Sequence, residues 1–129
     1  MNSPKELPPL VLNSVPAGFT SPAEDTVDQS LDLNAHLVRH PAATFFVRVS
    51  GNSMEGANIF SGDILVVDKA IEATDGKIVV AIVDGEFTVK RLVKRKGKIQ
   101  LVAENPAYPP IQGKFEVWGV VTYIIHAAK

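Results

Sequence analysis

The sequence contains no cysteine, which excludes a disulfide framework, a thiol nucleophile and thiolate metal ligands. Its three histidines, His36, His40 and His126, are scattered and lack the spacing of a metal site. We interpret each of them as a surface or hydrogen-bonded histidine. No metal and no other cofactor is therefore expected.

Neither sign of charge dominates, because the formal net charge is -1. A global positive field that would attract nucleic acid is missing, so proteins are the expected partners. Long apolar runs are also missing: the longest, residues 117–125, is far shorter than the roughly 20 residues of a spanning helix. Lys5 and Glu6 are followed by prolines where the apolar part of a signal peptide would run. We therefore expect a soluble, cytoplasmic protein.

The chain of 129 residues is long enough for one moderate hydrophobic core. Residues 1–25 are rich in helix-breaking proline, which predicts an extended N-terminal arm ahead of a domain at residues 26–129. Asp32 is placed to cap a short helix over residues 33–39, which Pro41 would end.

From residue 44 onward the pattern favours β-strands. Residues 44–50 have the alternating pattern of a strand, with Phe45, Val47 and Val49 on one side. Residues 64–67 and 78–83 are β-branched runs suited to burial on both faces. Asp84-Gly85 and Lys96-Gly97 are two-residue hairpin turns that create a three-strand meander over about residues 77–103. A last strand is expected at residues 116–126. The fold class is mainly β, with one short helix and a further turn after Ser53.

A serine at a strand end and a lysine within a strand are the candidate chemical groups. Gly51-Asn52-Ser53-Met54 follows the first strand, where glycine allows a sharp turn that presents a hydroxyl. Taken alone this is weak, since serines often follow glycine in loops. Lys90 can equally be a solvated strand lysine. No histidine is placed to activate Ser53, so a Ser-Lys pair is the simpler catalytic arrangement.

The hairpin registers favour a buried Lys90. Counting back from Asp84-Gly85 places Val79 opposite Lys90, and counting from Lys96-Gly97 places Ala103 on its other side. With Leu92 along the strand, these neighbours would desolvate the amine and favour its neutral form, which is a competent general base. Thr88 lies two residues away on the same face and can accept a hydrogen bond from the amine.

Ordered blocks of sequence resemble the LexA/UmuD family of self-cleaving serine peptidases, and the UmuD branch most closely. The separation of Ser53 and Lys90 agrees with the family's spacing of nucleophile and base. The resemblance covers nearly the whole chain. Its blocks are Ala17-Gly18-Phe19, Asp32-Leu33-Asn34, Val49-Ser50-Gly51-Asn52-Ser53-Met54, Ser61-Gly62-Asp63-Ile64-Leu65-Val66-Val67-Asp68, Asp84-Gly85-Glu86-Phe87-Thr88-Val89-Lys90-Arg91-Leu92, Asn105-Pro106-Ala107-Tyr108 and Val117-Trp118-Gly119-Val120-Val121.

The resemblance implies a LexA-type peptidase fold of curved antiparallel sheets with one or two short helices and an extended N-terminal arm. It implies that Ser53 is the nucleophile, that Lys90 is the base and that the arm is cut between Ala17 and Gly18. Thr88 and Asn52 are candidate supporting residues. A RecA filament on single-stranded DNA would activate the cut in the SOS DNA-damage response. The shortened homodimer would then serve an error-prone Y-family polymerase subunit of the UmuC-like kind in translesion synthesis.

Alternatives remain open beside this interpretation. Only 17 residues precede Gly18, too few for a helix-turn-helix domain, so operator binding is not expected. A non-cleaving module that regulates a polymerase or repressor is a different class of function. The basic residues near the second hairpin can form a nucleic-acid patch, but a charged hairpin tip that keeps an edge soluble is preferred, because no aromatic interleaves them. Residues 117–125 are expected to form a long apolar strand with an unpaired edge, which invites a two-fold dimer.

Overall fold

The computed structural model describes residues 9–11, 27–30 and 32–128, and the chain divides into two compact units, Met1–Leu37 and Val38–Lys129. In the first unit, strand β1 (Pro9–Val11) pairs antiparallel with β2 (Val27–Ser30), and helix α1 (Leu33–Leu37) follows. Residues 12–26 lie outside the described residues, and they include the predicted cut between Ala17 and Gly18.

Helix α1 is shorter than the predicted helix over residues 33–39. Its start is as expected, since the Ala35 amide donates to Asp32 Oδ1 at 3.3 Å. The helix ends at Leu37, however, and His40 has φ -126° and ψ 82°, outside the helical region. The ring of Pro41 disfavours helical geometry at the residue before it, so the helix cannot continue to the proline.

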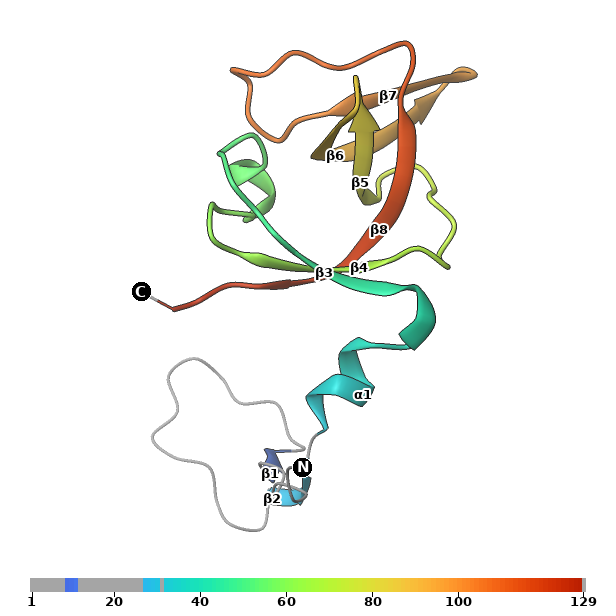
Figure 1. Cartoon of the computed structure of the whole chain (residues 1–129). Helices are drawn as coiled ribbons and strands as arrows, with labels where there is room; N and C mark the ends of the chain where they lie inside the picture. Colours follow the sequence, from blue (N-terminus) through green and yellow to red (C-terminus); the bar gives the residue numbers. More distant parts are fainter. Residues whose placement is uncertain (1–8, 12–26, 31, 129) are drawn as a thin grey trace. The chain divides into compact units, whose positions relative to one another are not determined.

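The second unit is a curved, six-stranded antiparallel sheet with strand order β3-β4-β8-β5-β6-β7, which confirms the mainly β class (Figure 1). Two single-turn 3-10 helices, η2 (Pro41–Ala43) and η3 (Glu55–Ala57), accompany it. The strands are β3 (Thr44–Arg48), β4 (Ile64–Asp68), β5 (Ile78–Val83), β6 (Glu86–Arg95), β7 (Lys98–Val102) and β8 (Glu116–Ile125). Within the described residues no helix combines the length and apolar character needed to cross a membrane.

Strand β8 joins the two halves of the sheet, running from the β5–β6–β7 group to β3 and β4 in Figure 1. Its first half, Glu116 to Val120, pairs with β5, and its second half, from Val120 on, pairs with β4. The expectation that residues 117–125 form an unpaired edge is therefore wrong. Within the part of the chain that is described, residues 121–125 lack a strand partner on the side that faces β5, and residues 116–119 lack one on the side that faces β4.

The core consists of the apolar runs that the sequence predicted to be buried on both faces. Leu65, Val66 and Val67 of β4 are fully buried, and so are Val79 and the two residues that follow it in β5. Burying side chains of this kind contributes about 1.5–3 kcal/mol each. The turn that contains Ser53 connects β3 to the buried strand β4.

Both hairpin turns have the predicted form. Asp84 and Gly85 have φ angles of 51° and 79°, and the Lys96-Gly97 turn has the same left-handed geometry. Two successive positive φ angles identify type I′ turns, whose twist matches that of the flanking strands. The register between β5 and β6 consequently pairs Val79 with Lys90, as predicted. The β6–β7 ladder has the predicted register and ends at Arg91 and Val102, one pair short of Lys90 and Ala103.

Candidate active site

The side chains of Ser53 and Lys90 are in hydrogen-bond contact. Ser53 lies in the turn after β3, where Gly51 adopts φ +95°, a backbone conformation that side chains other than glycine rarely tolerate. Lys90 lies in the middle of β6 and is only 6% exposed. Its Nζ is 3.0 Å from Ser53 Oγ, a hydrogen-bond distance.

Two further oxygens surround the lysine nitrogen. Lys90 Nζ donates to Thr88 Oγ1 at 2.9 Å and to the Val89 carbonyl at 3.2 Å. A neutral amine has two hydrogens and one lone pair. When both hydrogens are used by Thr88 and Val89, the lone pair is left facing the Ser53 hydroxyl, so the geometry suits proton transfer from that hydroxyl.

Burial lowers the pKa of Lys90 from its ordinary value, since desolvation disfavours the ammonium form. The apolar neighbours predicted from the register account for this burial. Val79 is completely buried, and Leu92 and Ala103 are 2% and 9% exposed. Among the described residues, no carboxylate bonds to Lys90. The site therefore combines a serine hydroxyl with an amine whose neutral form is favoured.

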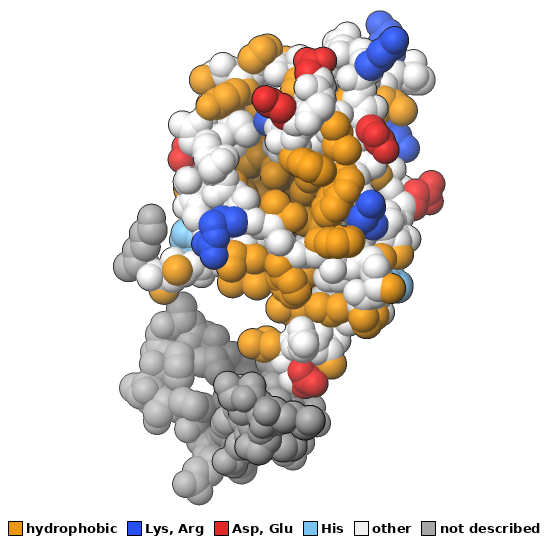
Figure 2. Space-filling model, viewed as in Figure 1, with side chains coloured by type: hydrophobic (Ala, Val, Ile, Leu, Met, Phe, Trp, Pro, Cys, Tyr) orange, Lys and Arg blue, Asp and Glu red, His pale blue; other side chains and the backbone are white. Residues whose placement is uncertain are grey.

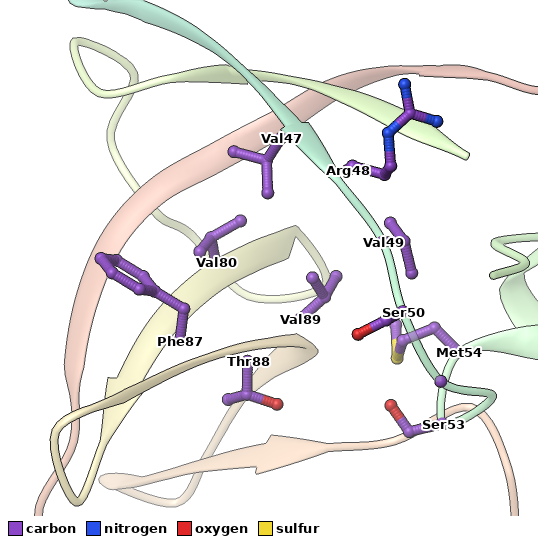
Figure 3. A pocket seen from close by; sticks show the side chains of 11 residues that line it. Val47, Arg48, Val49, Ser50, Ser53, Met54, Val80, Phe87, Thr88 and Val89 are labelled. Atoms are coloured by element: carbon purple, nitrogen blue, oxygen red, sulfur yellow. The ribbon is translucent and has the colours of Figure 1, made fainter. Parts of the chain in front are cut away.

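A groove of about 160 Å³ runs beside Ser53, between β3 and the strands β5 and β6 (Figure 3). The hydroxyls of Ser50, Ser53 and Thr88 gather at one end of it, and the side chains of Val47 and Phe87 lie at the other. Figure 2 shows hydrophobic side chains gathered in a hollow on the viewed face. Because β3 is an edge strand, an extended peptide can lie along the groove with its backbone beside that edge.

An aromatic group adjoins the apolar end of this groove. Trp118 of β8 lies between Phe45 and Phe87, with ring centroids 5.0 Å and 5.4 Å away. Phe87 is 62% exposed although it packs on Trp118. No sequence pattern predicts this group, because the three rings come from separate strands and only the strand order brings them together.

The predicted supporting residue Asn52 does not contact Lys90 but anchors the turn that carries Ser53. Its side-chain Oδ1 accepts from the Tyr108 hydroxyl at 2.5 Å, and its carbonyl accepts from Asn105 Nδ2 at 3.1 Å. Asn105 and Tyr108 had no assigned role in the sequence analysis. The signal that could have found them is their place in one block of the family resemblance.

The histidines form no part of this site. His40 Nδ1 bonds to Asp68 Oδ2 at 2.6 Å, and His126 Nδ1 bonds to Asp63 Oδ1 at 2.5 Å. Burial raises the pKa of Asp68, but the hydrogen bonds from His40 and from the Ala70 amide bring it below its ordinary value. No histidine lines the groove beside Ser53. Within the described residues no cluster of histidine and carboxylate side chains is arranged to hold a metal ion.

Comparison with known proteins gives matches along nearly the whole chain. A family model described as Peptidase S24-like matches residues 9–122. Protein SamA of Salmonella typhimurium is 51% identical over 122 residues, which cover 94% of this chain and 86% of that protein. Protein MucA of Escherichia coli is 47% identical over 120 residues, which cover 89% of this chain and 82% of that protein. The LexA repressor of Ectopseudomonas mendocina is 42% identical over 106 residues, covering 82% of this chain and 52% of the repressor.

Proposed function

The chain belongs to the Peptidase S24-like family, and from this premise we propose that it is a serine peptidase that cuts its own N-terminal arm between Ala17 and Gly18. Ser53 is the nucleophile and Lys90 is the general base. The observation that carries the proposal is the 3.0 Å contact between Ser53 Oγ and the nitrogen of a buried lysine. A lysine with a lowered pKa next to a serine hydroxyl is a recognised way to activate the nucleophile.

The reaction follows from the two groups. The neutral Lys90 amine takes the Ser53 proton while Ser53 Oγ attacks the carbonyl carbon of Ala17, and backbone N–H groups near Ser53 stabilise the oxyanion. The Lys90 ammonium then protonates the nitrogen of Gly18, which leaves as a new amino terminus. Water hydrolyses the ester between Ser53 and Ala17, with Lys90 again as base, and releases a fragment that ends at Ala17.

A small residue on each side of the cut suits the proposed chemistry. A glycine after the scissile bond allows the kinked backbone that brings a carbonyl to a half-buried serine. Thr88 and the Val89 carbonyl keep the Lys90 nitrogen in place through both proton transfers. Asn52 acts through the backbone of the turn and not on the substrate.

The biological role proposed here rests on the family resemblance. A RecA filament on single-stranded DNA stimulates the cut during the SOS response. The shortened protein then acts as a cytoplasmic accessory subunit of a UmuC-like, Y-family translesion polymerase. The second candidate is a non-cleaving module that docks onto a polymerase or repressor, and the exposed aromatic Phe87 beside Trp118 favours it as a contact surface.

Incubation at mildly alkaline pH, with and without RecA, nucleotide and single-stranded DNA, tests the cut. The new amino terminus is expected to read Gly18-Phe19-Thr20, and mass measurement should find the fragment that ends at Ala17.

Gly18→Glu should block release, since a bulky charged side chain must then enter a site for a minimal residue. A cut elsewhere, such as Ala42-Ala43, would refute the assigned bond and leave the dyad standing. An intact chain under all conditions favours the non-cleaving module.

We also propose a homodimer that pairs residues 121–125 of two copies. This half of β8 has a strand partner on one side only, and Ile124 and Ile125 are 37% and 42% exposed. Sedimentation equilibrium at micromolar concentration is expected to give the mass of two chains. Ile124→Lys should shift the mass toward one chain, whereas Ile99→Lys, at a 48% exposed position on β7, should not. A monomeric native chain would contradict the proposal.

A further inference from the structure

The connection between β7 and β8 returns to the turn that carries Ser53. The Gly56 amide, in η3, donates to the Glu104 carbonyl at 2.8 Å. A Cβ added at Gly56 would lie 2.3 Å from that carbonyl oxygen. Only glycine therefore allows the two backbones to approach this closely. The connection is therefore in direct backbone contact with the segment just after the nucleophile.

The same connection holds the residue just before the nucleophile. Asn105 Nδ2 donates to the Asn52 carbonyl, and the Tyr108 hydroxyl donates to the Asn52 side chain. The carbonyl and the side-chain oxygen of Asn52 are thus both bonded by a segment outside the turn. This matters because Gly51 precedes it, and glycine restricts the backbone less than any other residue. Contacts with a second segment add to the turn's own hydrogen bonds in restricting its conformation.

Residues 104–108 are themselves well fixed. Asn105 Oδ1 accepts from the Ala107 amide at 3.0 Å, and its carbonyl accepts from the Tyr108 amide at 3.0 Å. Glu104 pairs with Arg91, which also donates to the Gly76 carbonyl at 2.7 Å. Arg91 follows Lys90 in β6. One strand therefore positions the amine directly and, through Glu104, the turn that carries the hydroxyl.

We infer that residues 104–108 are a positioning element for the nucleophile, in which Asn105 and Tyr108 hold Asn52 and thereby keep the Ser53 hydroxyl against Lys90. The inference rests on the proposed function and deepens it. In this assignment Asn105 and the Tyr108 hydroxyl bond to Asn52, and they bond neither to the Ser53 hydroxyl nor to the Lys90 amine. They act on the rate through the position of Ser53, and small displacements of a reacting group from its productive geometry slow a reaction strongly.

Two conservative variants separate positioning from folding. Tyr108→Phe removes the hydroxyl but keeps the ring, whose centroid lies 5.9 Å from Lys90 Nζ, so the surroundings of the amine stay the same. Asn105→Ser keeps a short side-chain oxygen that can accept from Ala107 but removes the amide donor to Asn52, and it adds no charge near Lys90. Gln112→Ala is the matched control: it lies in the same connection, and its side chain bonds to Gln100, away from the turn.

Self-cleavage is measured across pH, together with the melting temperature. Each of the first two variants should lower the plateau rate at alkaline pH by about tenfold, with the midpoint of the pH profile and the melting temperature close to wild type. Gln112→Ala should match wild type in all three. In an Asn52→Ala background, Tyr108→Phe should have no further effect on the plateau, because the hydrogen bond is already absent.

The outcomes separate this inference from the proposed function. If wild type cuts itself and both variants reach its plateau, the positioning role is wrong and the dyad stands. A lower plateau that tracks a lower melting temperature, or that Gln112→Ala shares, assigns residues 104–108 to folding and also overturns the inference. If wild type does not cut itself, both proposals fall.

Discussion

Replacing Ser53 with alanine is expected to abolish release of the arm fragment while the domain stays folded. The hydroxyl supplies the nucleophile, and losing a nucleophile in a serine peptidase lowers the rate by roughly 10⁶-fold. Its contribution to the fold is small, because Ser53 is half-buried and Oγ bonds only to Lys90 Nζ among the described residues. Mass spectrometry of the incubated variant, with circular dichroism for the fold, makes the measurement.

Ser61→Ala is the matched control for this experiment. Ser61 is exposed in the turn before β4 and does not line the groove. Its loss of a hydroxyl should leave the rate at the wild-type value. Continued release of the fragment from Ser53→Ala would show that another group is the nucleophile.

The second large effect concerns pH. Cleavage should rise with pH and level off above the depressed pKa of Lys90, because burial disfavours the ammonium and only the neutral amine can take the Ser53 proton. Lys90→Arg should be inactive at every accessible pH, since a guanidinium stays charged. Rates measured from mildly acid to alkaline conditions give the midpoint of the profile.

Charged neighbours should move that midpoint in a known direction. Val79→Asp places a carboxylate opposite Lys90, which stabilises the ammonium and shifts the profile to higher pH. Ala103→Asp makes the same test at a less buried position and so puts less strain on folding. Val83→Asp is the control, because Val83 pairs with Glu86 at the hairpin end. If Val79→Asp and Ala103→Asp leave the midpoint where it was, burial by these neighbours does not set the pKa of Lys90.

The site was predictable where local rules fix geometry. A two-residue turn at Asp84-Gly85 leaves one register for the hairpin, so counting residues was enough to place Val79 opposite Lys90. The family resemblance then named Ser53 as its partner. The 3.0 Å contact agrees with both arguments, although they are independent.

The contacts between segments far apart in the sequence could not be predicted by counting residues from a turn. An apolar strand such as residues 117–125 has the same composition at a sheet edge and in its interior, so the position of β8 between β4 and β5 was missed. The contact of Asn105 with Asn52 joins residues 53 positions apart. Neither segment has a periodicity that indicates the other, and only the closed fold brings them together.

The burial of the Lys90 amine also affects the stability of the domain. An unfolded chain keeps Lys90 near its ordinary pKa of 10.5, whereas the folded chain holds it lower. Unfolding therefore takes up protons between those two values, and the free energy of unfolding rises with pH across that interval. The penalty is complete below the depressed pKa and vanishes above about 10.5. The burial of Lys90 thus makes the domain less stable at neutral pH than at strongly alkaline pH, and the apolar core of β4 and β5 must offset the difference.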